Sequence, residues 1–313
     1  MPFAPNPAYR LPAAELRSLS EVQGWRTTFH LVAEWGSIVA VAWLCERFWS
    51  PAAYLLGVIW IGARLHALAV LAHDGAHFLL YRSRRRNDLL CQLFCAWPLF
   101  MSLQAYRRIH LKHHTHVNTP DDPDWARNRP DRLRTRHGTV ELARILLGLS
   151  SEQRELMKFF TTREAQDGDA AARRLRAIRL AYYAAIVALF VYSGRPDLLL
   201  LYWLVPLFSW FLIAMRLKGI AEHFAVEDTD AANASRTMEL SWLERTLFAP
   251  KNIQYHAEHH LYPTVPCHHL RTLHARLMQN PAYRERVHVT RGYLGMIREC
   301  ARASADAAIG QAR

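Results

Sequence analysis

The stretches His73-Asp-Gly-Ala-His77, His110-Leu-Lys-His113-His114 and His256-Ala-Glu-His259-His260 decide how the rest of this sequence is interpreted. Within each stretch the histidines stand three or four positions apart, which places their imidazoles on one face of a helical turn. Eight imidazoles are more than one metal ion can use, and they suit two ions held close together. Histidine is abundant, with seventeen residues. Two copies of HxxHH and one HxxxH, each beside a hydrophobic stretch, nevertheless favour a metal site.

Composition predicts a membrane protein. Of the 313 residues, 51% are hydrophobic and 21% are charged, and the mean hydropathy is −0.09. This mixture fits a few membrane spans attached to a large charged region. We expect residues 1–313 to form a single membrane-embedded unit with four spans, near 28–48, 51–72, 180–192 and 198–215. Each approaches the roughly 20 residues that cross the hydrocarbon core. The apolar run from Leu89 to Tyr106 contains Pro98, and we expect it to be interfacial or re-entrant.

The charges around these spans predict the orientation. Arg82 and Arg84 to Arg86 follow the second span, and the stretch 127–179 is strongly basic. The turns near Ser50 and at 193–197 are short and weakly charged. The positive-inside rule therefore predicts that the N-terminus, region 73–178 and region 216–313 lie in the cytoplasm. All three histidine stretches then lie on one side of the membrane.

The motifs HDGAH, RRIHLKHHTH with DDPDW after it, and FAPKNIQYHAEHHLYPTVPCHHL carry a family resemblance. The sequence resembles the integral-membrane fatty acid desaturase family, whose pattern is HxxxH, HxxHH and HxxHH. The resemblance runs from about His66 to His274. In the flanking segments GIAEH, SRT and NIQYHAEHH, the sequence most resembles the bacterial branch of the family that includes the rhizobitoxine desaturase.

The resemblance implies an all-α fold in which four transmembrane helices carry a cytoplasmic helical cap with a histidine-rich di-iron site. It implies two non-haem Fe ions, O₂ as co-substrate and electrons from an external donor. A further histidine just past the fourth span, here His223, completes one metal's shell in related desaturases. Some relatives have an asparagine four residues earlier that reaches the metal through water, but this chain has Gly219. The metal ligands implied are His73, His77, His110, His113, His114, His223, His256, His259 and His260.

Four other histidines near these motifs are not expected to be ligands. They are His116, His268, His269 and His274. Ligating imidazoles usually donate their second N–H to a carboxylate or carbonyl. The carboxylates placed to do so are Asp74, Asp121, Asp122 and Asp124, although the sequence does not pair them with particular histidines.

We expect an O₂-dependent membrane oxidoreductase that introduces a double bond into an aliphatic chain. The substrate could be a fatty acyl lipid, an acyl carrier conjugate or an amino-acid-derived molecule. A hydroxylase or ketolase of the same superfamily is the near alternative, because the histidine motifs do not discriminate between these outcomes. The distant alternative is a non-enzymatic membrane protein that binds metal or haem. The sequence has no fused haem domain, CxxC-rich segment or GxGxxG motif, so we expect a separate electron donor such as ferredoxin with its reductase.

The net charge of +12 raises the question of nucleic-acid binding. Its arginines and lysines flank the spans, where anionic lipid headgroups account for them, so no nucleic-acid partner is expected. The five cysteines form no CxxC pair and are expected to be reduced thiols, with Cys91 and Cys95 as packing residues. No signal peptide is evident. We expect a multi-pass protein of the bacterial inner membrane whose site faces the cytoplasm.

Overall fold

The computed structural model describes residues 6–124, 170–226 and 229–310. Regular structure in these ranges is almost entirely helical. Four of the described helices are long and apolar enough to cross a membrane, namely Ala13–Arg47, Pro51–Ala76, Arg173–Tyr192 and Asp197–His223. The predicted all-α architecture with four membrane helices is confirmed. Residues 125–169 of the predicted region 73–178 lie outside the described residues.

The long elements are α2 (Gly24–Arg47), α3 (Pro51–Ala76), α5 (Leu103–His116), α9 (Ala170–Tyr192), α11 (Leu212–His223) and α16 (Gly292–Gly310). The shorter helices are α1 (Ala13–Leu19), α4 (Arg84–Cys91), α10 (Asp197–Leu199), α12 (Trp242–Leu247), α13 (His256–Leu261), α14 (Leu270–Leu277) and α15 (Pro281–Arg284). Turns of 3₁₀ or π geometry are η1 (Pro7–Tyr9), η2 (Gln92–Ala96), η3 (Trp97–Leu99), η5 (Leu200–Leu204), η6 (Leu207–Phe211), η7 (Pro250–Asn252) and η8 (Cys267–His269).

Helix α3 is the central element. Ser50 caps it, since its hydroxyl accepts the Ala53 N–H at 3.1 Å, and Pro51 occupies the first turn, where a missing N–H costs nothing. Nearly every residue from Ile61 to Ala76 is buried. Neighbours of α3 are α2, α5 and turns η2, η6 and η7. The last turn of α3 therefore delivers its histidines into the interior of the protein.

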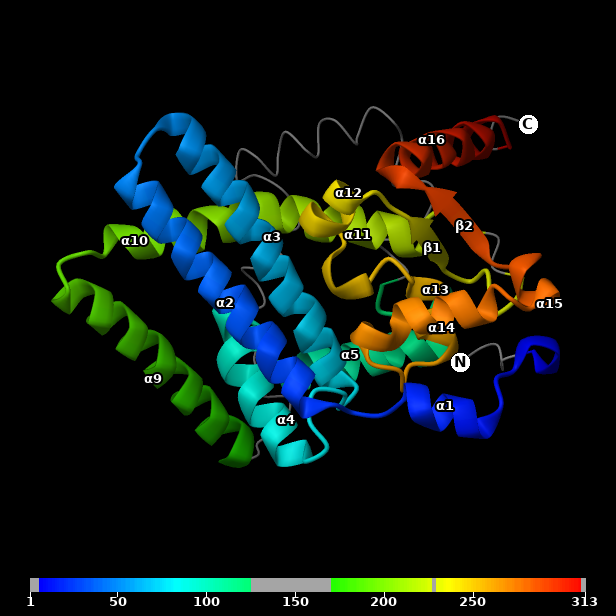
Figure 1. Cartoon of the computed structure of the whole chain (residues 1–313), viewed down its shortest axis with the longest axis horizontal. Coiled ribbons are helices and arrows are strands. Elements are labelled where there is room, and N and C mark those ends of the chain that lie inside the picture. Colours follow the sequence, from blue (N-terminus) through cyan, green and yellow to red (C-terminus); the bar gives the residue numbers. More distant parts are fainter. Residues whose placement is uncertain (1–5, 125–169, 227–228, 311–313) are drawn as a thin grey trace.

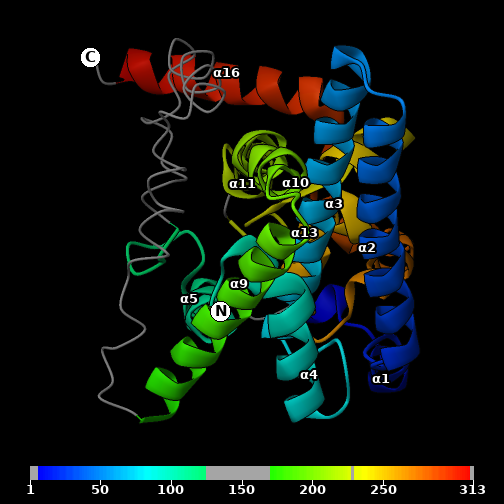
Figure 2. The same ribbon diagram turned by 90° about the vertical axis from the view of Figure 1, so that its left-hand side faces the viewer.

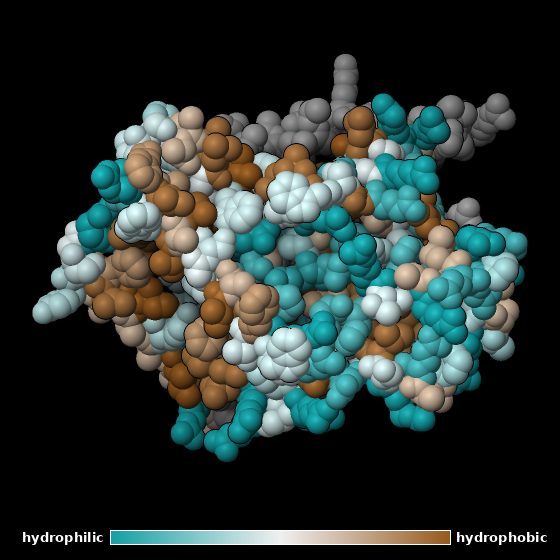
Figure 3. Space-filling view, in the orientation of Figure 1, coloured by the Kyte–Doolittle hydropathy of each residue, from teal (hydrophilic) through white to brown (hydrophobic). Residues whose placement is uncertain are grey.

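The membrane-facing and cap halves separate clearly. Helices α2 and α3 lie side by side, while α13, α14 and α15 lie to the right of them, with α15 the farthest away (Figure 1). Helix α9 stands along the outside (Figure 2), and Tyr182 and Tyr183 donate from it to the carbonyls of Leu93 and Trp97. Hydrophobic side chains cover the part formed by α2, α9 and α10, and hydrophilic ones cover much of the cap (Figure 3).

The helices extend beyond the predicted spans, because helical hydrogen bonding continues after the hydropathy falls. Helix α2 begins at Gly24 rather than near 28, and α3 continues past 72 to Ala76. Helix α9 begins at Ala170 rather than near 180, since long arginine side chains reach out from a span end to polar surroundings. The fourth candidate span continues past 215 to His223. This extension brings His223 to the cap.

The apolar run from Leu89 to Tyr106 does not form one straight helix. The segments Arg84–Leu99 and Leu103–His116 meet at an angle of 90°. Phe100 adopts a left-handed conformation with φ 59° at the break, and Ser102 caps α5 by accepting the Ala105 N–H. This bend turns α5 so that it packs against α3.

Among the described residues, the cap also contains a pair of short strands. Strands β1 (Arg236–Glu239) and β2 (His288–Arg291) pair in parallel, with Arg236 opposite His288. The Met238 N–H also donates to the Gln254 carbonyl at 2.9 Å, just before α13. Two strands of four residues, so far apart in sequence, are too short for an alternating pattern to predict. The ribbon supports the segment that leads into α13.

Candidate metal centre

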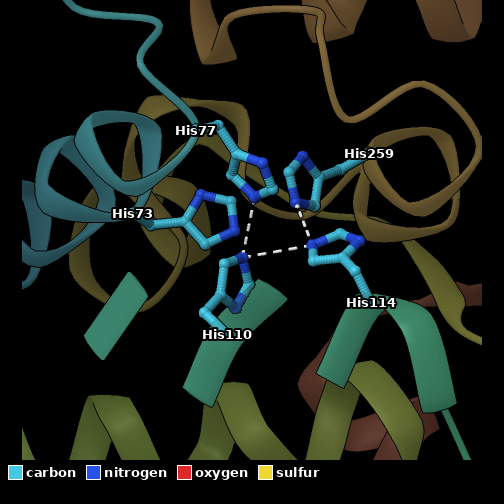
Figure 4. Close-up of side chains that lie close together, drawn as sticks. All are labelled: His73, His77, His110, His114 and His259. Atoms are coloured by element: carbon cyan, nitrogen blue, oxygen red, sulfur yellow. Dashed lines mark hydrogen bonds between the residues drawn. The ribbon is translucent and has the colours of Figure 1, made fainter. Parts of the chain in front are cut away.

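The first group of histidines lies where α3 ends against α5 and α13. Each member offers one ring nitrogen within 4.8 Å of the others, and together they form the five-histidine cluster: His73, His77, His110, His114 and His259. Their rings converge on a common centre (Figure 4). Three elements far apart in the sequence thus supply one group of nitrogen donors.

The second group lies beside the first. It is the four-histidine cluster, formed by His113 of α5, His223 at the end of α11, and His256 and His260 of α13. All four members are buried. The structure therefore brings together all nine histidines that the sequence and its resemblance single out, and it divides them between two centres.

The two HxxHH motifs contribute to both clusters in opposite ways. In the second motif His110 and His114 face the five-histidine cluster, and His113 faces the other. In the third motif His256 and His260 face the four-histidine cluster, and His259 faces the other. Residues four apart point in nearly the same direction, whereas adjacent residues such as His113 and His114 are about 100° apart around the helix axis. Each motif therefore serves both clusters.

The Nε2 atoms of the four-histidine cluster form a closed ring. The distances are 3.1 Å from His113 to His223, 2.9 Å from His223 to His256, 3.0 Å from His256 to His260 and 3.3 Å from His260 to His113. A ring nitrogen either donates one proton or accepts with one lone pair. Four such atoms with two neighbours each can form at most two hydrogen bonds, so some contacts are unfavourable without a cation.

These distances also suit ligands of one ion. Two nitrogens bonded to the same metal at about 2.1 Å lie about 3.0–3.4 Å apart, for bond angles between a right angle and a tetrahedral one. The ring matches this spacing closely. The four-histidine cluster therefore fits one metal ion.

The five-histidine cluster leads to the same conclusion. His110 Nε2 lies 2.8 Å from His77 Nε2 and 3.1 Å from His114 Nε2, and His114 Nε2 lies 3.0 Å from His259 Nε2. His73 is 3% exposed, yet neither of its ring nitrogens has a hydrogen-bond partner. A buried polar atom without a partner is costly. A metal ion at the common centre would satisfy it.

Burial favours the neutral, metal-binding form of several of these imidazoles. It lowers the pKa of His77 to about 3, with a further contribution from His73. Burial, followed by neighbouring histidines, also lowers the pKa of His110, His259 and His260 well below the usual value. Each neutral ring keeps a lone pair to offer to a metal.

Carboxylates support the four-histidine cluster from behind. The Nδ1 atom of His113 lies 2.9 Å and 3.0 Å from the two oxygens of buried Asp122. Asp122 also accepts the backbone N–H groups of Asn118 and Asp124. On another side, Glu222 Oε1 lies 3.3 Å from His256 Nδ1, and Glu222 Oε2 lies 2.6 Å from Lys218 Nζ. The bond to Asp122 fixes the His113 ring and directs its opposite nitrogen to the centre, whereas Glu222 Oε1 and His256 Nδ1 form no hydrogen bond with each other.

The five-histidine cluster has weaker carboxylate support. Asp74 Oδ1 lies 3.6 Å from His73 Nδ1, beyond hydrogen-bond distance, and Asp74 Oδ2 accepts the Cys267 N–H at 2.9 Å. Among the proposed carboxylates, Asp122 thus pairs with a cluster histidine, Asp124 lies close to the same pair, and Asp121 is exposed. Asp74 connects α3 to η8 instead.

A further buried carboxylate anchors α13 from its far side. Glu258 is completely buried. It accepts Thr237 Oγ1 at 2.6 Å, His274 Nδ1 at 2.5 Å and Tyr283 OH at 3.0 Å. These bonds tie α13 to β1, α14 and α15. His256, His259 and His260 are thereby held in place.

The remaining sequence candidates lie outside both clusters. His116 Nδ1 contacts Thr115 Oγ1 and the Lys112 carbonyl, and His268 and His269 lie in η8. At Gly219 an added Cβ would meet no atom within 4 Å, so the chain leaves open space there. The contact that some relatives make through asparagine therefore has no counterpart from this residue.

Sequence reasoning missed the roles of Glu222 and Glu258. Glu222 stands directly before His223 and Glu258 stands within the third motif. Glu222 stands in a largely apolar stretch, which is a signal for a buried carboxylate with a partner. Lys218 stands four residues before Glu222, a spacing that places the two on one helical face, whereas His274 and Tyr283 could only be found from the fold.

The chain is similar to several known proteins. The model of the fatty acid desaturase family matches residues 49–292. Dihydrorhizobitoxine desaturase from Bradyrhizobium elkanii is 28% identical over 78% of this chain and 72% of its own length. Beta-carotene ketolase from a Paracoccus strain is 26% identical over 83% of this chain and 93% of its own length. The sn-1 oleoyl-lipid 12-desaturase from Anabaena variabilis is 24% identical over 78% of this chain and 75% of its own length.

Proposed function

Because the chain belongs to the fatty acid desaturase family, and so is a membrane oxidoreductase of the desaturase and hydroxylase type, we propose that it is a di-iron, O₂-dependent enzyme. Its reaction introduces a double bond into an aliphatic chain. The observation that carries this proposal is the pair of adjacent histidine clusters with the nitrogen spacing of two metal centres.

The residues fit two metal ions. The five-histidine cluster would hold one and the four-histidine cluster the other. Imidazole alone suits several metals, and the family favours iron. Bound iron supplies the redox chemistry with O₂ that removal of hydrogen from an unactivated chain needs.

The protein's own groups position and protect these ions. Asp122 holds His113, Glu222 lies beside His256, and Glu258 fixes α13. Burial of the clusters excludes bulk water. No protein acid or base is required in this scheme, since the side chains act by holding ligands at fixed positions.

The substrate and partners follow from the same proposal. An apolar chain in the membrane would reach the centre from the span side, and electrons would come from a separate donor such as ferredoxin with its reductase. The relatives that desaturate oleoyl lipids support a lipid substrate, while the similarity to dihydrorhizobitoxine desaturase supports a small amino-acid-derived one. Comparing lipids and metabolites of cells with and without the gene by mass spectrometry distinguishes these two.

Ketolation is a second candidate, favoured by the similarity to beta-carotene ketolase over nearly all of that protein's length. The same mass spectra separate the outcomes. A desaturated product is lighter than its precursor by two hydrogens, and a hydroxylated one is heavier by one oxygen. A ketone gains one oxygen and loses two hydrogens.

Metal analysis tests the proposal itself. Purified protein from iron-replete cells should carry two Fe per chain without haem absorbance. Zinc alone, or a Soret band, would contradict the di-iron assignment. Either result would favour the non-enzymatic alternative.

We also propose that the clusters face the cytoplasm of a bacterial inner membrane. Reporter fusions after Arg86, within 161–169 and at the C-terminus should then report cytoplasm. Fusions near Ser50 and Gly194 should report the opposite face. A cytoplasmic signal near Ser50 would mean that 28–72 forms a re-entrant hairpin, and a non-cytoplasmic signal within 161–169 would contradict the topology.

A further inference from the structure

A second group of nitrogen-bearing side chains lies outside the metal centre, where the start of α2 meets η7 and η8. We call it the junction cluster, and its members are Arg26, His30, Lys251, His268 and His269. None of them belongs to either metal cluster. On this face the surface is hollowed and hydrophilic between the α2–α3 pair and the cap (Figure 3).

Direct contacts fix η7 to α2. Lys251 Nζ lies 2.7 Å from Glu34 Oε1 and 2.9 Å from His30 Nδ1. Arg64 NH1 lies 3.2 Å from the second oxygen of Glu34. One buried carboxylate therefore faces two cations.

The surrounding charges leave this junction positive. Arg26 forms no ion pair with a carboxylate among the described residues. Glu21 pairs with Arg82 at 2.6 Å, and Asp74 accepts the Cys267 N–H beside η8. The junction and its neighbours hold three cations, Arg26, Arg64 and Lys251. Two carboxylates, Asp74 and Glu34, face them, so one positive charge has no counter-charge.

Nitrogen atoms at the junction also lack hydrogen-bond partners. Arg26 is half-buried, and its Nε has no hydrogen-bond partner. The Nε2 atoms of His268 and His269 are likewise buried and without a partner, and their rings are 4.4 Å apart. Burial, followed by His269, lowers the pKa of His268 to about 4. Both imidazoles can therefore donate an N–H without carrying a charge.

The junction lies close to both the membrane interface and the metal centre. Trp25 and Phe29 flank Arg26 on the first turns of α2 and are 68% and 65% exposed, as expected of aromatic residues at headgroup level. On the other side, the Cys267 N–H, one residue before His268, donates at 2.9 Å to Asp74, the neighbour of His73. A group bound here would be anchored next to the ligand-bearing end of α3.

We propose that the junction cluster binds an oxyanion, a carboxylate or phosphate, at the end of an apolar chain. Arg26 supplies the charge, and Lys251, His268 and His269 supply further N–H donors. This inference rests on the proposed function, because it assigns the anionic end of the aliphatic substrate to this site. The same chemistry would suit a phospholipid headgroup, and the test distinguishes the two sources.

The test measures equilibrium binding to the full-length protein in nanodiscs of neutral phosphatidylcholine. The probes are radiolabelled tetradecanoate, its uncharged methyl ester and phosphatidylglycerol. We expect wild-type protein to bind tetradecanoate at least about tenfold more tightly than the ester, the scale of one hydrogen bond to a charged group. Arg26→Gln should lose about that factor, and Arg26→Lys should recover part of it. The matched control is Arg298→Ala, which removes an exposed arginine of α16.

If Arg26→Gln loses only tetradecanoate binding, the occupant is the anionic end of the substrate. If it loses only phosphatidylglycerol binding, the occupant is a lipid headgroup. Unchanged affinity for both probes in Arg26→Gln and in the double variant His268→Asn with His269→Asn would overturn the proposal. Equal loss in Arg298→Ala would also overturn it. Binding requires no turnover, and iron content is measured on the same samples, so failure here is separable from failure of the di-iron assignment.

Discussion

The five-histidine and four-histidine clusters are built from the same motifs but are supported differently. In the four-histidine cluster, Asp122 holds His113 through both carboxylate oxygens, and Glu222 lies 3.3 Å from His256. In the five-histidine cluster, the nearest of the carboxylates considered, Asp74, is 3.6 Å from His73 and bonds to Cys267 instead. One cluster has more imidazoles, whereas the other has more carboxylates behind them.

This difference teaches that ligand number and ligand support compensate for one another. Five imidazoles from α3, α5 and α13 enclose a centre without help from carboxylates. Four imidazoles form a more open ring, and their orientation depends on outer partners. We therefore expect the four-histidine cluster to be more sensitive to loss of a single group.

The largest effect should come from single variants that remove one HxxHH histidine, either from the four-histidine cluster or from the five-histidine cluster. His113→Ala and His259→Ala should each reduce turnover by more than about a hundredfold, since loss of an outer partner alone costs 10–100-fold. Iron measured by plasma mass spectrometry should fall further in His113→Ala, which leaves three imidazoles. Near-full activity in either variant would contradict the assignment.

His223 and His116 give the next test. His223 is the member of the four-histidine cluster that belongs to none of the three motifs, whereas His116 contacts Thr115 and a backbone carbonyl. His223→Ala should lose most activity and part of the iron, and His116→Ala should keep a substantial fraction of both. A reversed ranking would require the second motif to be redrawn with His116.

Carboxylate variants should have intermediate effects that distinguish the clusters. Asp122→Asn should lower activity and iron affinity by about 10–100-fold, because it removes the charged acceptor of His113. Glu222→Gln should act in the same direction, and Asp74→Asn should have less effect. Exposed Asp121→Asn is the matched control. Equal losses for Asp74→Asn and Asp122→Asn would remove the difference between the two clusters.

The smallest effect should come from the far side of α13. Tyr283→Phe removes one hydrogen bond to buried Glu258 and should destabilise the protein by about 1–3 kcal/mol. Its melting midpoint, followed by intrinsic fluorescence, should fall, with iron still bound. Tyr192→Phe serves as the control, since Tyr192 is 95% exposed. An unchanged midpoint in Tyr283→Phe would mean that Glu258 does not depend on this bond.

Much of the fold was predictable because it depends on local patterns. Four apolar stretches predicted four membrane helices, and Pro98 predicted the break before α5. The helix ends were less predictable, since Arg173 and Lys218 belong to helices whose polar ends still form backbone hydrogen bonds. The β1–β2 ribbon escaped prediction because its pairing is long-range and only four residues long.

The candidate site shows the same limit. Spacing within His110-Leu-Lys-His113-His114 predicts which imidazoles share a helical face. It does not predict which cluster each face meets, since this depends on the crossing of α5 and α13. Asp122, nine residues after His113, was within reach of sequence reasoning. The bond between Glu258 and His274 was not, because it joins two helices through the packing of the cap.

The most direct test of two separate centres is anomalous diffraction at the iron edge from crystals of the purified protein. We predict two peaks per chain, one bonded to imidazoles of the five-histidine cluster and one to those of the four-histidine cluster. A single peak would contradict two separate centres, and so would a peak bonded to imidazoles of both the five-histidine and the four-histidine cluster.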